Sequence, residues 1–240
     1  MNAAQRVVRP ERLDVLSPDD PRARRSRDDL QRVHRAMGSV AIMCRAIDCL
    51  NLAVPPRRVL ELGAGDGTLL LRMARTMFSS WSDVDATLLD QHDLVTPTTR
   101  SAFAQLGWRI RVLRTDVLDW ARRDSIEHYN LCVSTLFLHH FHAADLALLL
   151  AAAAARVDAL VACEPRRNVF AALGSRLVGL LGSNAVTRHD AVTSVVAGFA
   201  AQELTALWPH TPNAWHLQEY WALPFTHCFT AVRTAGSSLR

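Results

Sequence analysis

Short apolar runs alternate with stretches of helical periodicity over most of this chain of 240 residues. The runs lie at residues 59–62, 86–90, 109–114, 131–136 and 158–164, and helical patterns lie between them. A strand followed by a helix and another strand is the unit of a parallel sheet, because a parallel pair needs a long crossover connection. The pattern therefore predicts an α/β fold built on a parallel sheet.

Local signals refine this prediction. Thr96 followed by Pro97 is typical of a helix start and predicts a helix over 97–106. Further helices are expected over 117–124, 143–155, 166–181 and 190–207. Two runs at 215–222 and 225–232 are expected to be strands joined around Pro224, so the sheet should end in an antiparallel hairpin.

The N-terminal region differs in composition. Residues 1–27 carry three prolines among arginines and aspartates, which predicts an extended, solvated arm. From Asp28, a residue suited to cap a helix, apolar residues recur at near-helical spacing to residue 51, and Pro55 and Pro56 end the segment. We therefore divide the chain into an N-terminal arm and helical lid, 1–55, and a main domain, 56–240. Two placements are open for the helices: a lid over a ligand site at the strand ends, or an extension of one helical layer.

Composition excludes several classes of enzyme. All 27 basic residues are arginine, and the chain has no lysine. Phosphate-loop nucleotidases, Schiff-base or pyridoxal enzymes and dehydrogenases with a Tyr–Lys pair all need a lysine amine, so these classes are excluded. The net charge of +4 is modest and does not by itself indicate nucleic acid.

The cysteines and the hydropathy pattern bear on the compartment. The five cysteines include no CxxC pair, which favours reduced thiols over a disulfide framework or structural zinc. No apolar run approaches the about 18 residues of a membrane span, and the arginine-rich N-terminus lacks the apolar centre of a signal peptide. We expect a cytoplasmic protein without a membrane span.

The most informative stretch is an apolar run with one acid, Glu61, that leads into glycines at positions 63, 65 and 67. Glycine permits positive φ and lets a ligand approach the backbone, and the helix that follows offers free N–H groups. The spacing is GxGxG, whereas the dinucleotide fingerprint is GxGxxG. With an acid two residues before the first glycine, the stretch resembles motif I of class I S-adenosylmethionine-dependent methyltransferases.

This resemblance implies a fold and a cofactor. The family fold is a Rossmann-like, doubly wound sheet of seven strands, mostly parallel with an antiparallel C-terminal hairpin, to which this chain would add an N-terminal helical segment. S-adenosylmethionine would bind at the carboxyl ends of the strands, where the strand order reverses. The residues expected at the cofactor are Glu61, Gly63, Ala64, Gly65, Gly67, Asp90, Gln91, Asp116, Val117 and Ser134.

The three acids have distinct roles in the family. Glu61 would reach the methionine amino group, Asp90 would accept both ribose hydroxyls, and Asp116 would accept the adenine amino group. Each aspartate also has an ordinary explanation: Asp90 as an acid in a solvated loop, and Asp116 as the N-cap of the helix 117–124. A nicotinamide-binding fold would also need Asp90 but has no comparable use for Asp116.

Residues 134–141, with the sequence STLFLHHF, follow the fourth strand and resemble the LHH segment of small-molecule methyltransferases of the quinone-biosynthesis type. One imidazole, His139 or His140, is suited to remove a proton from a substrate hydroxyl, since its pKa lies near neutrality. A structural role is equally open, in which the pair binds the next helix and orients the cofactor. No Asp-Asn pair follows the fifth strand as in metal-dependent catechol enzymes, so we expect no metal.

One more polar segment and the missing motifs narrow the acceptor. Residues 184–190 include Arg188, His189 and Asp190 between two predicted helices, which indicates a polar substrate contact or a helix cap at Asp190. The chain lacks the NPPY or DPPY motif, the Pro-Cys nucleophile and the lysines that common DNA and RNA methyltransferases use. The order of segments is also similar to that of small bacterial methyltransferases of type III polyketide pathways.

We therefore expect methyl transfer to a small, largely apolar acceptor, by O-methylation of a phenol, quinol or polyketide-like compound. Nucleic acid is not expected as a partner. Two alternatives stay open: an RNA methyltransferase that uses the arginines of residues 22–35, and a noncatalytic protein that keeps the cofactor fold.

Overall fold

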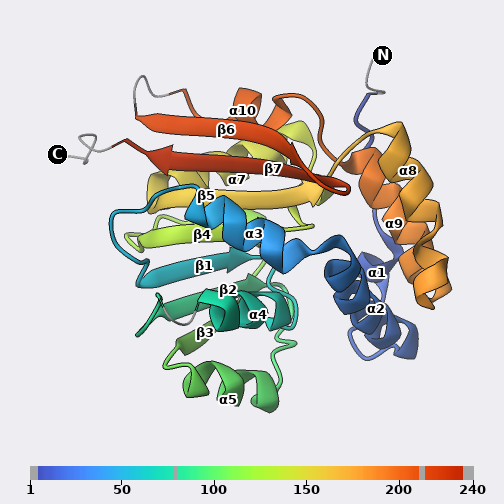
Figure 1. Cartoon of the computed structure of the whole chain (residues 1–240), viewed down its shortest axis with the longest axis horizontal. Coiled ribbons are helices and arrows are strands. Elements are labelled where there is room, and N and C mark those ends of the chain that lie inside the picture. The colour runs from blue at the N-terminus through green and yellow to red at the C-terminus, as the bar shows by residue number, and fades with distance from the viewer. Residues whose placement is uncertain (1–4, 78–79, 211–213, 235–240) are drawn as a thin grey trace.

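A single sheet of seven strands organises the chain (Figure 1). The computed structural model describes residues 5–77, 80–210 and 214–234. The strand order is β3-β2-β1-β4-β5-β7-β6, and the strands are β1 (Arg58–Leu62), β2 (Asp85–Asp90), β3 (Arg109–Arg114), β4 (Tyr129–Thr135), β5 (Val157–Pro165), β6 (Trp215–Ala222) and β7 (Thr226–Arg233). β1 to β5 are parallel, and β7 is antiparallel to both β5 and β6. The predicted fold class, with its antiparallel hairpin, is confirmed.

The position of a strand in the sheet explains its sequence. β5 lies inside the sheet and is buried at nearly every position, because helices or other elements cover both of its faces. The edge strand β3 reads RIRVLR and has no fully buried residue. The other edge strand, β6, alternates between half-buried and exposed positions along most of its length. Continuous apolar runs therefore marked the central strands, and mixed runs marked the edges.

Two helical layers cover the sheet. α3 (Ser39–Asp48), α4 (Thr68–Met77) and α5 (Pro97–Gln105) lie on the face toward the viewer in Figure 1. Their side chains form one core, which includes Met43, Leu70 and Phe103. α6 (Val117–Arg122), α7 (Ala143–Arg156) and α10 (Glu203–Leu207) contribute residues such as Trp120 and Leu149 to a second core. The thiols of Cys44, Cys132, Cys163 and Cys228 are buried and form no disulfide, and that of Cys49 is exposed.

A third group of helices gathers at the carboxyl ends of the parallel strands, on the right of Figure 1. It consists of α1 (Arg12–Val15), α2 (Pro21–Met37), α8 (Val169–Arg176) and α9 (Ala185–Ala197), with the 3₁₀ helices η1 (Leu138–His140) and η2 (Val178–Leu181) beside them. Ligands of doubly wound sheets bind at this edge. None of the helices among the described residues is long and apolar enough to cross a bilayer.

The predicted solvated arm is wrong over the described part of residues 1–27. α2 begins at Pro21 instead of Asp28, because Asp20 caps it by accepting a hydrogen bond from Arg22 N at 2.8 Å and proline suits the first turn. Ahead of α2, the side chain of Glu11 is buried, and α1 packs against α9. The first four residues of the predicted arm lie outside the described residues.

The helical segment 28–51 belongs to two helices with different surroundings. Gly38 ends α2 at a φ of 66°, a left-handed conformation that glycine adopts without strain, and α3 follows at once. Leu30 and Val33 of α2 line a cavity at the strand ends. Met43 and Ile47 of α3 are buried in the core that covers the sheet. α3 therefore shares a core with residues 56–240, although the boundary at residue 55 assigns the helix to the N-terminal segment.

Two predicted helices are interrupted. The helix expected over 166–181 is α8 followed by η2, and the helix expected over 190–207 is α9 and α10 with an extended connection between them. In that connection Phe199 N donates to Pro165 O at 2.9 Å, and a Cβ on Gly198 would lie 2.2 Å from the same oxygen. The close approach of this backbone to the end of β5 breaks the helix, and the helical periodicity of the sequence carries no sign of it.

Candidate cofactor and acceptor site

The glycine-rich turn joins β1 to α4 with three residues at positive φ. The φ angles are 67° at Gly63, 54° at Gly65 and 71° at Gly67, all in the region that favours glycine. A Cβ on Gly63 would also lie 2.3 Å from the ring of Phe137, which excludes any larger residue without movement of that ring. A Cβ on Gly65 would meet no atom within 4 Å, so the backbone there faces open space. The turn therefore leaves room for a ligand at Gly65 and packs tightly at Gly63.

Asp90 connects this turn to the next strand. Its carboxylate accepts hydrogen bonds from Gly65 N and His92 N, both at 2.9 Å. Asp90 also lines a cavity of about 320 Å³ at the carboxyl ends of β1, β2 and β3, together with the predicted residues Gly63, Gln91, Asp116 and Val117. The structure thus brings five of the ten predicted cofactor residues to one cavity, and it gives Asp90 backbone partners within it.

Asp116 caps a helix, as the ordinary explanation predicts. Its side chain accepts from Leu118 N at 2.7 Å and from Asp119 N at 3.4 Å at the start of α6. Because Asp116 also lines the cavity, a cap and a ligand contact are compatible at this position. Its role toward adenine stays a prediction.

Two predicted residues hold buried polar atoms without partners. Glu61 Oε2 and Ser134 Oγ make no hydrogen bond, although Glu61 is 4 % exposed and Ser134 is fully buried. Burial, followed by the charges of Asp66 and Asp90, raises the pKa of Glu61 well above its ordinary value. A buried carboxyl without a partner is costly unless a cation or donor approaches it. Glu61 therefore fits the ammonium group that S-adenosylmethionine carries, and the residues present fit this cofactor.

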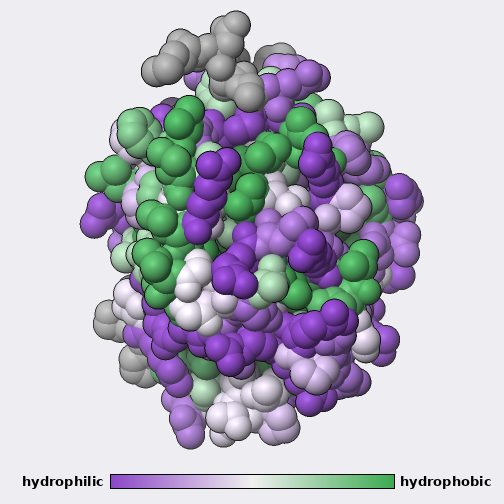
Figure 2. Space-filling view, turned by 90° about the vertical axis from the view of Figure 1, so that its right-hand side faces the viewer, coloured by the Kyte–Doolittle hydropathy of each residue, from purple (hydrophilic) through white to green (hydrophobic). Residues whose placement is uncertain are grey.

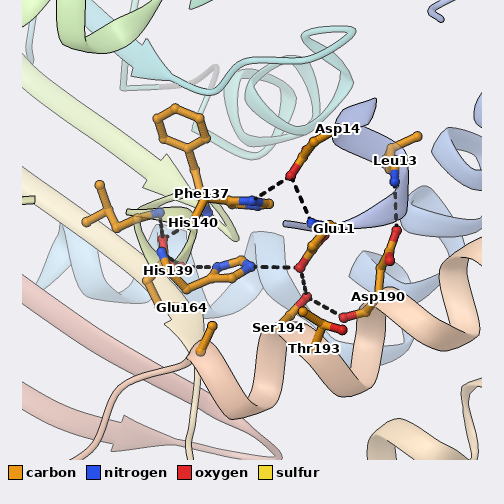
Figure 3. A network of polar contacts seen from close by, with 12 residues as sticks. Glu11, Leu13, Asp14, Phe137, His139, His140, Glu164, Asp190, Thr193 and Ser194 are labelled. Atoms are coloured by element: carbon orange, nitrogen blue, oxygen red, sulfur yellow. Dashed lines mark hydrogen bonds and ion pairs between the residues drawn. The ribbon is translucent and has the colours of Figure 1, made fainter. Parts of the chain in front are cut away.

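His139 lies between two acids from distant parts of the chain (Figure 3). Its Nδ1 is 2.8 Å from Glu164 Oε2, at the end of β5, and its Nε2 is 3.3 Å from Glu11 Oε1, just before α1. Burial alone would lower the pKa of His139, but the hydrogen bonds and charges of the two acids outweigh it and raise the pKa to about 9. His139 therefore carries two protons at pH 7 and donates both, so it cannot accept one as a general base.

His140 has a different environment. Its Nδ1 is 3.2 Å from Asp14 Oδ2 of α1, and both residues line the cavity of Gly63 and Asp90. Burial alone would raise the pKa of Asp14, but the hydrogen bond to His140 and the charge of His140 lower it overall. In the neutral tautomer that donates from Nδ1 to Asp14, His140 would keep a lone pair at Nε2. The two adjacent histidines therefore differ in chemistry because different carboxylates face them.

Glu164 also fixes the backbone of the LHH segment. One carboxylate oxygen accepts from Phe137 N at 3.1 Å and Leu138 N at 2.9 Å, while the other accepts from His139 N at 3.3 Å. These donors satisfy both oxygens of a fully buried carboxyl group. The start of η1 is thereby fixed to the end of β5.

The site could offer ligands to a metal ion. Glu11, His139 and His140 each present one atom, and these three atoms lie within 4.8 Å of one another. A histidine binds a metal ion only as a neutral imidazole with a free lone pair. Both nitrogens of His139 face carboxylates, which favours the doubly protonated ring. The absence of a metal stays a prediction.

Asp190 does not cap the helix in which it lies, whereas Thr187 and Asp190 line the apolar cavity at the strand ends, so a substrate contact by the segment 184–190 stays a prediction. Asn184, not Asp190, caps α9 by accepting from Thr187 N at 2.9 Å. Asp190 lies inside α9 and accepts from Arg12 N at 2.9 Å and Leu13 N at 3.0 Å, so it satisfies the free N–H groups of α1 (Figure 3). Asp190 thus caps α1, and Leu13 of that helix lies 177 residues away from Asp190 in the sequence.

Sequence reasoning missed the acids of the N-terminal arm. Glu11 and Asp14 have the three-residue spacing of a capping box, and the structure contains one at α1. That signal could have predicted α1, but not that both side chains reach the histidines of η1. Ser194 of α9 also hydrogen-bonds Glu11, which adds a third element to the network.

Comparisons with known proteins agree with this fold. Residues 59–158 match a family model described as a methyltransferase domain, whereas no curated protein matches the chain. An O-methyltransferase family protein from Burkholderia thailandensis has a TM-score of 0.58 at 20% identity, over 91% of this chain and 62% of that one. The plantazolicin methyltransferase BpumL, in complex with SAH, has a TM-score of 0.63 at 11% identity, over 90% of this chain and 92% of that one. The pyocyanin biosynthetic protein PhzM has a TM-score of 0.54 at 15% identity, over 90% of this chain and 60% of that one.

The solved structures share the fold of this chain, and the region matched by the family model includes the glycine turn. This chain spans less than two thirds of the length of the B. thailandensis protein and of PhzM. The matched region contains the glycine turn, Asp90, Asp116 and the LHH segment. Residues 59–158, which include the glycine turn, match a methyltransferase domain, and the seven-stranded fold around them is similar to that of solved methyltransferases.

Proposed function

We propose that the chain methylates a hydroxyl oxygen on a small, largely apolar acceptor such as a phenol or quinol. The observation that carries this proposal is an apolar cavity of about 370 Å³ beside the LHH segment. Its walls come from α2, α8, η2 and α9 and from the ends of β4 and β5. Apolar side chains dominate its lining, including Leu30, Val33, Met37, Val178 and Phe225. A pocket of this kind binds apolar ligands and orients them through a few polar groups.

Asp90 and His140 line the neighbouring cavity at the glycine turn, where the cofactor would bind. S-adenosylmethionine would supply a methyl group on a sulfonium sulfur, with S-adenosylhomocysteine and a proton as by-products. Glu61, Gly65 and Asp90 would hold it, and Phe137 would limit its position next to Gly63. His140 would take the hydroxyl proton at Nε2, while Asp14 holds the ring by Nδ1. His139 would carry its charge without exchanging protons with the acceptor.

A thin wall separates the two cavities. Leu13 and Leu136 line the apolar cavity, whereas their chain neighbours Asp14 and Phe137 line the cofactor cavity. Transfer requires the oxygen to come within contact distance of the methyl carbon. We infer that α1 shifts when the acceptor binds, so that the arm closes the site and excludes water. α2 then acts as the lid wall that residues 28–51 were expected to provide.

The RNA alternative has less support. Four arginines of α2 already have acidic partners: Arg22 with Asp20, Arg24 with Asp19, and Arg25 and Arg32 with Asp29. Pairing reduces the positive charge that a phosphate-binding arm needs. The noncatalytic alternative is separated from the proposal by the experiment below.

The test is to incubate the chain with methyl-labelled S-adenosylmethionine and a library of phenols and quinols, and to detect labelled products by mass spectrometry. His140→Gln is expected to lower kcat by about 10²-fold to 10⁴-fold, because it removes the proposed base. His142→Gln is the matched control, since His142 is exposed two residues away and forms the N-cap of α7 without a side-chain bond.

Three outcomes contradict parts of the proposal. S-adenosylhomocysteine binding with no labelled product from any acceptor supports the noncatalytic alternative. Full activity in His140→Gln removes that residue from the mechanism. Labelling of RNA in place of the phenols, with binding that weakens steeply as salt rises, favours the RNA methyltransferase.

A further inference from the structure

The outer face of α8 and η2 exposes apolar side chains to solvent. These are Val169, Phe170, Leu173, Leu177, Leu180 and Leu181, and we call them the α8–η2 face. Phe170 is 75% exposed and Leu180 is 82% exposed. Figure 2 looks onto this end of the molecule, and hydrophobic side chains gather on its upper half, at the height of α8 in Figure 1. Contiguous apolar surface on a folded protein marks a place where something else binds.

The exposed side chains of α8 are apolar except for that of Arg176 at its end. Its inner face, with Ala171, Gly174 and Ser175, lines the apolar cavity, and its outer face carries Phe170 and Leu173. A helix with apolar side chains on two opposite faces is ordinarily covered on both of them. Here only the inner side is covered, so the outer side is left for a partner.

The charged residues in the part of the sequence that forms this face are all positive. Between Glu164 and Asp190 the chain has no acid and four arginines, at positions 166, 167, 176 and 188. Arg176 is exposed on α8 itself, and the Arg188 side chain lies against Gly179 of η2. From α2, Arg25 Nη2 donates to Gly182 O at 3.2 Å, directly after η2. Apolar residues flanked by arginines on a short helix are the pattern of a segment that lies in the interface of an anionic bilayer.

The face is continuous with the apolar cavity. Leu177, Leu180 and Leu181 are exposed at the surface and also line that cavity. A ligand that leaves an apolar phase at this point meets apolar side chains along its whole path inward. A soluble, polar acceptor would gain nothing from such an entrance.

We propose that the α8–η2 face binds the surface of an anionic lipid bilayer and that apolar acceptors enter the cavity from it. The binding itself does not depend on methyl transfer, so it can fail or succeed independently of the proposed function. The arginines favour a lipid surface over a second copy of this chain, because two such faces would place like charges against each other.

The experiment is flotation of the full chain with vesicles of phosphatidylcholine alone and of phosphatidylcholine mixed with phosphatidylglycerol. Binding is expected to the mixed vesicles and to weaken as salt rises. Phe170→Ser combined with Leu180→Ser is expected to lower the partition coefficient by at least about tenfold, since each side chain loses its burial in the acyl region. Arg176→Gln is expected to lower it by about fivefold on mixed vesicles only.

The matched control is Ile126→Ser. Ile126 is fully exposed, but it precedes β4 and so lies at the opposite end of the sheet. All variants are first checked for an unchanged thermal shift with S-adenosylhomocysteine, which shows that the fold is intact. Binding that Ile126→Ser reduces as much as the double variant overturns the proposal. So does equal recovery with both vesicle types, or a vesicle-independent dimer that the double variant dissociates.

Discussion

Replacing Glu11 by glutamine tests whether the arm stabilises His139 as an imidazolium. The pKa of His139 is raised from its ordinary value of 6.5 to about 9 by two buried carboxylates. Since one pKa unit corresponds to 1.36 kcal/mol, the shift that remains after the cost of burial corresponds to about 3 kcal/mol of net stabilisation of the protonated ring in the folded chain. Glu11 is the more distant of the two, at 3.3 Å against 2.8 Å for Glu164. We assign it the smaller part, about 1 kcal/mol.

The sign of the pH dependence follows from the direction of the shift. The folded chain binds the His139 proton more tightly than the unfolded chain, so the contribution is complete below about pH 6.5 and is lost as the pH rises to about 9. Glu11→Gln should therefore destabilise the chain by about 1 kcal/mol at about pH 6, and the difference from wild type should shrink toward zero above about pH 9. Urea unfolding of both proteins across this range measures it.

Asp19→Asn is the control for this experiment. Asp19 lies on the same arm and pairs with Arg24, but its side chain is 87% exposed. An exposed pair of this kind contributes less than about 1 kcal/mol, and its contribution should not change between pH 6 and 9. The reasoning is refuted if Glu11→Gln lowers stability equally at both ends of the range, because a lost packing contact would then explain the whole effect.

Three further predictions concern the cofactor site and the N-terminal helices. The pKa of Glu61 is raised well above 4.5 by burial, Asp66 and Asp90, so binding of S-adenosylhomocysteine should release a proton. Calorimetry in buffers of different ionisation enthalpy detects this release, and Glu61→Gln should abolish it. Binding enthalpies of the wild type that do not depend on the buffer contradict the prediction. Asp90→Ala should weaken S-adenosylhomocysteine binding by about 1.5 to 3 kcal/mol, through loss of a charged acceptor that also holds Gly65 N; unchanged affinity by titration would exclude Asp90 from the site. A chain that begins at Val54 should be insoluble, because it lacks the buried residues of α3; a soluble product that still binds S-adenosylhomocysteine would show that α3 is dispensable.

Sequence reasoning was reliable where a local pattern and a local structure coincide. The apolar runs predicted β1 to β5, and β3 and β6 have the predicted bounds. The glycines at 63, 65 and 67 all adopt the positive φ that their spacing indicated. Phase and spacing along the chain are enough in these cases, because a strand or a tight turn depends mainly on its own residues.

The breaks in the C-terminal helices were beyond such reasoning. Gly198 lies in a stretch with helical periodicity, yet a Cβ there would lie 2.2 Å from Pro165 O, and the next residue, Phe199, pairs with Arg166 just after β5. That contact joins residues far apart in the sequence, and tertiary packing overrides local propensity there. The start of α2 at Pro21 is different, since Asp20 and Pro21 are a local cap signal that the charged composition of the arm obscured.

The sequence by itself determined the sheet, the glycine turn and five of the ten predicted cofactor residues that line the cavity at the strand ends. It also placed two histidines side by side, but it left their roles open. Only the tertiary structure decided these roles, by bringing Glu11, Asp14 and Glu164 from three distant segments against the imidazoles. The physical reason is that a fold class follows from periodic burial along the chain, whereas the protonation of a side chain depends on which charges surround it in space.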